Sequence, residues 1–208
     1  MVTKLITKQN TQDTLEKKLT AERDRCLTTY TFLERRDRSK RSRHALAAYN
    51  IRLELKRAFP GVKFLVHSDS FAGGDAVDVH WTDGPTYEEV DRLISKYSRG
   101  RFDGQEEIYN YASGVAAVFG ELFGNTKYVT QGRSYSDKTI TQTIADCHTA
   151  HDNPSNPVPT LEAYRKGQLR EVFPARHYKS YAELVSDTLS KKNFVSVGPK
   201  IKAGVQNP

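Results

Sequence analysis

The stretch that determines the fold is VKFLVHSDSFAGGDAVDVHWT, residues 62–82. Apolar and polar residues alternate on both sides of its centre. The alternating apolar residues are Val62, Phe64, Val66, Val77, Val79 and Trp81. A period of two is typical of strands that bury one face. The centre, Ser68 to Asp75, is rich in Ser, Asp and Gly, so we expect an antiparallel pair of strands joined by a mobile loop.

Helical patterns lie on both sides of this pair. Before it, Ile51 and Leu55 share one face of a predicted helix that Pro60-Gly61 ends. After it, Thr86 and Glu89 form a capping box that begins another helix. Similar patterns predict further helices at about 13–36, 108–122, 137–148, 160–172 and 180–191, and a third strand at about 127–133.

These elements predict an α+β fold, with a small antiparallel sheet of about three strands packed against helices and with helical N- and C-terminal extensions. Residues 151–159 hold three prolines among turn formers, and such a segment cannot continue a helix. We interpret it as a linker. The predicted organisation is an N-terminal helical extension (1–42), an α+β core domain (43–150), the linker (151–159) and a C-terminal helical segment with a basic tail (160–208).

The composition favours a polyanionic partner. The 208 residues include 32 Lys and Arg against 25 Asp and Glu, a formal charge of +7, which attracts DNA, RNA or acidic protein surfaces. The cysteines, Cys26 and Cys147, cannot build a disulfide framework, which fits a reducing compartment. No stretch approaches the ~18 apolar residues that span a bilayer. We therefore expect a cytoplasmic protein without membrane contact.

Basic residues cluster in two parts of the sequence. Residues 34–43 contain six basic residues and two acidic ones, and residues 164–179 interleave Arg and Lys with Tyr, as phosphate contact and base stacking require. A solvated charged surface with Tyr as anchors explains the pattern equally well. The expected nucleic-acid or partner-binding residues are Arg35, Arg36, Arg38, Lys40, Arg41, Arg43, Arg52, Lys56, Arg133, Tyr135, Arg165, Arg170, Arg176 and Lys179.

The sequence contains no common catalytic motif, and we expect no catalytic residue, metal or cofactor. The function of two groups of side chains stays open. Cys147, His148 and His151 could share a metal ion, although a polar helix end complementing the helix dipole explains them better. The outer face of the predicted strand pair could carry acid/base chemistry, although polar residues are ordinary on an exposed sheet face. The residues of this face are Lys63, His67, Asp78 and His80.

Several separated motifs carry a resemblance to a known family. They are IRLELKRAFPGVKF (51–64), SDSFAGG (68–74), WTDGPT (81–86), Tyr97 with GRFDG (100–104), and YSD (135–137). Over about residues 45–148 the chain resembles the large polyvalent protein-associated domain family, twenty-ninth type, of phages and conjugative elements. The family supplies no catalytic residue that could be carried over to this sequence.

The resemblance implies a mobile-element protein that acts early in an infected or recipient cell. We therefore expect a non-enzymatic accessory protein that interferes with a host defence system, as an anti-CRISPR or anti-restriction protein, by binding its nucleoprotein. A DNA mimic would be acidic, so the positive charge argues for contact with nucleic acid or an acidic surface. The alternatives are a general DNA- or RNA-binding protein of a mobile element and an enzyme that uses the outer face of the strand pair. The defence system and the oligomeric state stay open.

Overall fold

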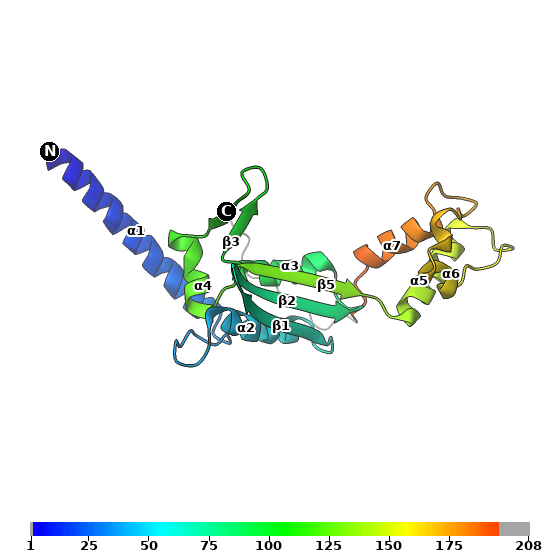
Figure 1. Cartoon of the computed structure of the whole chain (residues 1–208), viewed down its shortest axis with the longest axis horizontal. Coiled ribbons are helices and arrows are strands. Elements are labelled where there is room, and N and C mark those ends of the chain that lie inside the picture. Colours follow the sequence, from blue (N-terminus) through cyan, green and yellow to red (C-terminus); the bar gives the residue numbers. More distant parts are fainter. Residues whose placement is uncertain (1, 196–208) are drawn as a thin grey trace. The chain divides into compact units, whose positions relative to one another are not determined.

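The computed structural model describes residues 2–195 and confirms the α+β class, with helices at both ends of the chain (Figure 1). The helices are α1 (Val2–Thr29), α2 (Arg43–Ala58), α3 (Tyr87–Ile94), α4 (Val118–Phe123), α5 (Asp137–His151), α6 (Leu161–Arg165) and α7 (Tyr181–Lys191). The strands are β1 (Phe64–Phe71), β2 (Gly74–Thr82), β3 (Gly100–Asp103), β4 (Ile108–Tyr111) and β5 (Tyr128–Ser134). Short 3-10 helices are η1 (Ser95–Tyr97), η2 (Gly114–Ala117) and η3 (Gln168–Arg170).

The central sheet has three strands in the order β1-β2-β5. As predicted, Val77, Val79 and Trp81 on β2 are buried. The sheet is mixed and not wholly antiparallel. Side chains joining β2 to β5 keep a constant separation of 52 residues, in the pairs Asp75 with Lys127, Asp78 with Thr130 and Thr82 with Ser134. A constant separation means that these two strands are parallel, which requires the long crossover connection that α3 and α4 occupy.

The connection between β1 and β2 is shorter than the sequence predicted. Most of the expected loop, Ser68 to Asp75, belongs to the two strands, which extend to Phe71 and resume at Gly74. Gly73 has a φ of +104°, a conformation that residues with a side chain rarely adopt, so it supplies the turn. The polar residues in this stretch therefore lie on strands, and only Ala72 and Gly73 form the connection.

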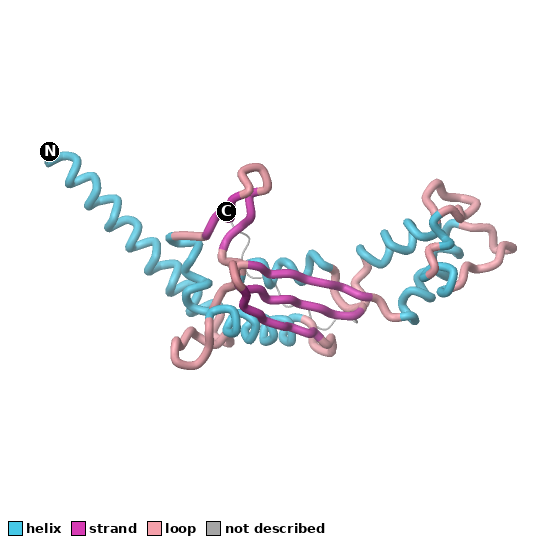
Figure 2. The backbone as a smooth tube through the Cα atoms, in the orientation of Figure 1, coloured by secondary structure: helices cyan, strands magenta, loops and turns pink. Residues whose placement is uncertain are grey.

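The prediction of a helix at about 108–122 is wrong for the first half of this range. Strands β3 and β4 form a separate antiparallel hairpin in which Gly100 pairs with Tyr111 (Figure 2). The spacing of Ile108, Tyr111 and Val115 imitates a helical face, but Tyr109 and Tyr111 favour a strand and Gly114, with a φ of +57°, interrupts any helix. Only the short 3-10 helix η2 and α4 remain of the predicted helix.

The helix starts were predicted more accurately. The Thr86 N–H donates to Glu89 Oε2 at 2.8 Å and the Glu89 N–H donates to Thr86 Oγ at 3.3 Å, so the predicted capping box is present. Ser180 and Glu183 make the same reciprocal pair at the start of α7. These caps satisfy backbone donors that the first helical turn leaves free.

The chain divides into two compact units. The first comprises Met1–Ala58, Phe64–Val79 and Asp91–Gln131, and the second comprises Phe59–Lys63, His80–Val90 and Gly132–Pro208. In the first unit α2 packs against β1. In the second unit α5 packs against α7 around Ile144, Val185 and Leu189. Helix α5 therefore packs with the C-terminal helices, whereas the sequence analysis placed it in the core domain that ends at residue 150.

Candidate functional site

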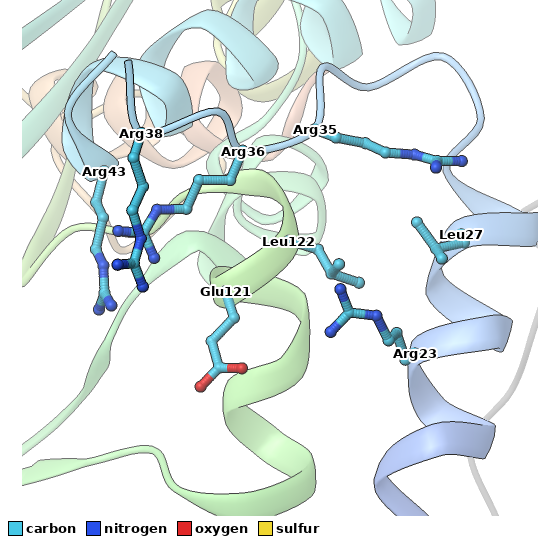
Figure 3. Close-up of a pocket in the computed structure, with 8 residues that line it drawn as sticks. All are labelled: Arg23, Leu27, Arg35, Arg36, Arg38, Arg43, Glu121 and Leu122. Carbon is cyan, nitrogen blue, oxygen red and sulfur yellow. The ribbon is translucent and has the colours of Figure 1, made fainter. Parts of the chain in front are cut away.

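A pocket in the first unit gathers a large share of that unit's arginines (Figure 3). Its volume is about 460 Å³, within the ~300–1,000 Å³ range typical of ligand sites. The lining residues are Arg23, Leu27, Arg35, Arg36, Arg38, Arg43, Glu121 and Leu122. They come from α1, the segment between α1 and α2, the start of α2, and α4. We treat this arginine pocket as the candidate functional site.

The segment between α1 and α2 is an ordered loop and not the helix end that the sequence predicted. Its backbone is held by the buried side chain of Asn50 on α2, which accepts from the Glu34 N–H at 2.8 Å and donates to the Glu34 carbonyl at 2.9 Å. The Asn50 amide also donates to the Phe123 carbonyl at 2.8 Å. Two residues further on, the Arg36 N–H donates to the Leu122 carbonyl at 2.7 Å. These bonds fix the loop against α2 and α4, so the arginines of the loop start from a defined backbone.

Helix α4 is brought close to α2 by a glycine. Gly124 has a φ of +87°, and a Cβ atom there would lie 2.6 Å from the Arg43 carbonyl and the Ala47 nitrogen. Only glycine permits this approach without strain. On its other side, Phe119 of α4 packs edge-on against Tyr30 with ring centroids 5.1 Å apart. The close contacts place Glu121 and Leu122 opposite the start of α2 and beside the end of α1.

The pocket arginines have no carboxylate partner among the residues that the structure describes. Between side chains that the structure describes, no ion pair within 4.0 Å involves any of the five arginines or Glu121. The neighbouring cations outside the lining behave differently, since Arg41 pairs with Glu34 and Lys40 lies 3.7 Å from Asp37. Five arginines against one glutamate leave the pocket strongly positive.

The surroundings of Arg36 also change the pKa of its guanidinium group. Burial and then the guanidinium groups of Arg43 and Arg38 lower the pKa of Arg36. In Figure 3 these three groups gather on one side of the pocket, while the two leucines lie toward the other side with Arg23. Guanidinium groups bind phosphate and carboxylate oxygens through paired hydrogen bonds, so such a cluster is suited to an anion.

The other predicted residues of the core domain do not join the pocket. Arg52 donates to the Val66 carbonyl, while Lys56 is exposed on the same helix. Arg133 is a correction to the sequence analysis, which grouped it with exposed contact residues. It is only 9% exposed, because its guanidinium donates to five backbone carbonyls of the second unit. These belong to Asp83, Gly84, Leu189, Ser190 and Lys192.

Tyr135 is tied to that buried arginine. Its ring lies 4.9 Å from the Arg133 guanidinium carbon and is half-buried. Burial raises the pKa of Tyr135, although the neighbouring Arg133 opposes this change. The aromatic and basic pair that the sequence suggested for base stacking therefore packs within the second unit.

The C-terminal basic residues are exposed but partly neutralised. Arg165 pairs with Asp137, and Lys179 pairs with Asp187. The adjacent Lys166 likewise lies 2.6 Å from Glu162. Arg170 and Arg176 are exposed on the same unit. The structure thus brings together Arg35, Arg36, Arg38 and Arg43 in one pocket and leaves the C-terminal residues without a comparable cluster in the part of the chain that it covers.

The residues considered for a metal are used for packing. Cys147 is buried 3.7 Å from the Thr188 hydroxyl, and His148 Nδ1 lies 2.8 Å from the Tyr181 hydroxyl. His151 stacks edge-on against His177. Among the side chains that the structure describes, no group of three or more His, Cys, Asp or Glu is placed to hold a metal ion. These side chains therefore have structural roles in the second unit.

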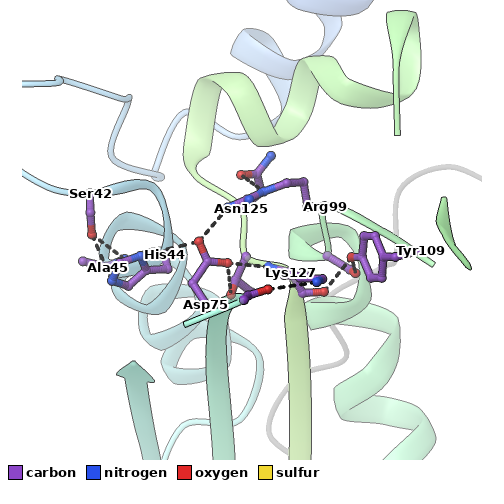
Figure 4. A network of polar contacts seen from close by, with 11 residues as sticks. Ser42, His44, Ala45, Asp75, Arg99, Tyr109, Asn125 and Lys127 are labelled. Carbon is purple, nitrogen blue, oxygen red and sulfur yellow. Dashed lines mark hydrogen bonds and ion pairs between the residues drawn. The ribbon is translucent and has the colours of Figure 1, made fainter. Parts of the chain in front are cut away.

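Most of the residues considered for acid/base chemistry on the outer face of the strand pair are exposed. Lys63, His67 and His80 are exposed, and Asp78 accepts a hydrogen bond from the Thr130 hydroxyl. Asp75, at the start of β2, forms a denser network (Figure 4). Its carboxylate accepts from the Lys127 N–H at 2.6 Å and from Arg99 at 2.7 Å. The carboxylate thereby links β2 to β5 and to the residues that precede β3.

Ser42, His44 and Asp75 lie in a row in this network, which invites comparison with a catalytic triad. The Ser42 hydroxyl lies 3.2 Å from His44 Nε2, but His44 Nδ1 is 3.8 Å from the Asp75 carboxylate, beyond hydrogen-bonding distance. The Ser42 hydroxyl also accepts from the Ala45 N–H, as a helix cap does. The geometry is that of a structural network around Asp75.

Sequence reasoning missed half of the pocket lining. Arg23 and Leu27 lie one turn apart on α1, a spacing that could have marked a shared face. Glu121 and Leu122 could not have been found, because the helix that carries them was predicted with the wrong extent and nothing local places α4 beside the basic loop.

The fold and the pocket define a basic α+β protein with an arginine-lined site. Residues 42–136 match the family model described as large polyvalent protein associated domain 29, which confirms the resemblance over somewhat less than half of the chain. The match associates the chain with phages and mobile elements. No curated protein and no solved structure gives a match. No helix among the described residues is long and apolar enough to cross a membrane.

Proposed function

We propose that this chain is a non-enzymatic accessory protein of a phage or conjugative element, and that it interferes with a host defence system in the cytoplasm by binding the nucleic acid of a defence nucleoprotein. The observation that carries the proposal is a pocket of about 460 Å³ with five arginines, none of which has a carboxylate partner among the described side chains. Phosphate oxygens are the partners that such a cluster lacks.

The family match supports the biological setting of the proposal. Proteins associated with phages and mobile elements encounter restriction and CRISPR systems of the host. The enzymes and effector complexes of these systems bind DNA or RNA. A positive pocket would compete for exposed phosphates of such a complex, whereas a decoy of DNA would carry negative charge. If the pocket binds nucleic acid but the protein does not protect a phage or plasmid from host defence, the function is general nucleic-acid binding during DNA transfer.

The test compares two double variants that each remove two positive charges. Arg36→Gln with Arg38→Gln alters the pocket, and Arg165→Gln with Lys166→Gln alters cations that already pair with Asp137 and Glu162. Fluorescence anisotropy with single- and double-stranded oligonucleotides at about 50 mM salt measures the affinity. We expect the pocket variant to bind about ten-fold more weakly, equivalent to about 1.4 kcal/mol, and the control to bind nearly as the natural chain does.

The same variants then enter a cell assay. Expression of the natural chain should raise the plating efficiency of a phage on a host that carries a restriction or CRISPR system, and the pocket variant should lose this effect. Absence of nucleic-acid binding by the natural chain at about 50 mM salt would exclude the proposed contact, because phosphate contacts strengthen as salt falls.

A further inference from the structure

Glu121 is the one carboxylate among the residues that line the arginine pocket, and its charge acts to raise the pKa of Arg36. A carboxylate repels phosphate, yet Glu121 points into the pocket in Figure 3 and makes no ion pair within 4.0 Å among the residues whose side chains are described. Its place in the first turn of α4 is favourable for the helix dipole, but any outward direction would serve that purpose equally. The side chain is exposed and makes no ion pair with an arginine whose side chain is described, so its oxygens are available to accept hydrogen bonds from the N–H or O–H donors of a ligand.

The other residues that line the pocket further restrict the chemical class of the ligand. The guanidinium groups of Arg36, Arg38 and Arg43 offer a phosphate site on one side, and Leu27 and Leu122 offer an apolar wall. A nucleotide combines the required features, because it carries a phosphate, a flat ring with an apolar face and, in guanine, two adjacent N–H donors on the Watson–Crick edge. Single-stranded bases are recognised by stacking and by hydrogen bonds to that edge.

We propose that the pocket takes one unpaired guanine nucleotide, with its phosphate at Arg36, Arg38 and Arg43, its ring beside Leu27 and Leu122, and its Watson–Crick edge donating to Glu121. The inference rests on the proposed function, since it specifies the part of the nucleic acid that enters the pocket. A paired guanine uses the same edge within the duplex and is therefore excluded. The nucleotide can belong to a strand or be free in solution.

The test uses three short thymidine oligonucleotides that differ at one central base, which is guanine, inosine or thymine. Inosine lacks the 2-amino group and so offers one donor fewer. We expect guanine to bind at least about five-fold more tightly than thymine, with inosine between them. Glu121→Gln should bring the ratio of the guanine and thymine affinities close to one, because its amide nitrogen would oppose a base donor. The variant should keep the circular dichroism spectrum of the natural chain.

Competition with guanosine 5′-monophosphate identifies the source of the ligand. Displacement at similar concentrations indicates a site for free nucleotides, and failure to displace indicates a site within a strand. Equal affinity for the three oligonucleotides would overturn the guanine inference while leaving nucleic-acid binding intact, and Glu121 would then be a helix-end charge. Absence of binding to every oligonucleotide would overturn the proposed function as well.

Discussion

Arg36 and Arg133 show that one residue type can serve opposite purposes. Arg133 is enclosed, and its guanidinium is saturated by backbone carbonyls at the end of α7 and before α3. Arg36 lines an open pocket without a carboxylate partner within the described chain, beside two further arginines. The sequence analysis grouped both as contact residues, because burial depends on contacts with residues about 50 positions away.

Replacing Arg133 tests its role at the residue scale. Arg133→Lys keeps the charge but cannot reach several carbonyls at once, since lysine has a single ammonium group. We expect the free energy of unfolding to fall by at least about 2 kcal/mol, because hydrogen bonds to charged groups contribute about 1.5–3 kcal/mol each. Urea unfolding followed by circular dichroism measures the change.

Arg170→Lys is the matched control, because Arg170 is exposed on the same unit. It should change the free energy of unfolding by less than about 0.5 kcal/mol. Equal stability of the two variants would show that the carbonyl contacts of Arg133 contribute nothing to the fold.

The elements of the first unit meet at Asp75. Its carboxylate joins the start of β2 to the start of β5 through the Lys127 N–H, to the residue before β3 through Arg99, and it faces His44 of α2. Strand periodicity predicted β2 but could not identify this role, because a Ser-, Asp- and Gly-rich stretch resembles a loop. Burial alone would raise the pKa of Asp75, but the hydrogen bonds from Lys127 and Arg99 outweigh it and lower the pKa.

The lowered pKa of Asp75 predicts a stability that depends on pH. The folded state binds this proton less readily than the unfolded state, whose carboxyl has its ordinary pKa of 3.8. The stabilisation is therefore present above that pH and is lost as the pH falls through the lower pKa of the folded state. Asp75→Asn should cost about 1–3 kcal/mol at pH 7.

The cost of Asp75→Asn should shrink as the pH falls below the ordinary aspartate pKa of 3.8 and through the lower pKa of the folded state, because only below that lower pKa is the natural carboxyl protonated in both states. Urea unfolding of the natural chain and the variant, at neutral pH and in acid, gives the difference directly. A difference that stays constant with pH would show that the Asp75 charge contributes nothing to the network. Asp69→Asn, on the exposed part of β1, should show little cost at either pH.

At the scale of the whole molecule, the class of fold was predictable and the site only in part. Alternating apolar residues placed β2 and one capping box placed the start of α3, while β5 and α7 were also predicted close to their observed bounds. The hairpin of β3 and β4 was not predictable, since its apolar spacing fits a helix equally well. Four pocket arginines were foreseen as a basic run, but their convergence depends on contacts of α4 with α1 and α2.

The pocket also extends beyond the segment that matches the family. The match begins at residue 42, so Arg43, Glu121 and Leu122 fall within it while α1 and the basic loop precede it. The matched segment and the residues before it thus both contribute to each side of the pocket.

The slope of the logarithm of affinity against the logarithm of salt concentration tests the central claim most directly, because each phosphate neutralised by the protein adds about 0.7–0.9 to it. Arg36→Gln, Arg38→Gln and Arg43→Gln should each reduce the slope, by at most about that amount, while Arg170→Gln should leave it unchanged. Slopes identical to that of the natural chain in all three pocket variants would contradict the claim that this pocket binds the phosphates of a nucleic acid.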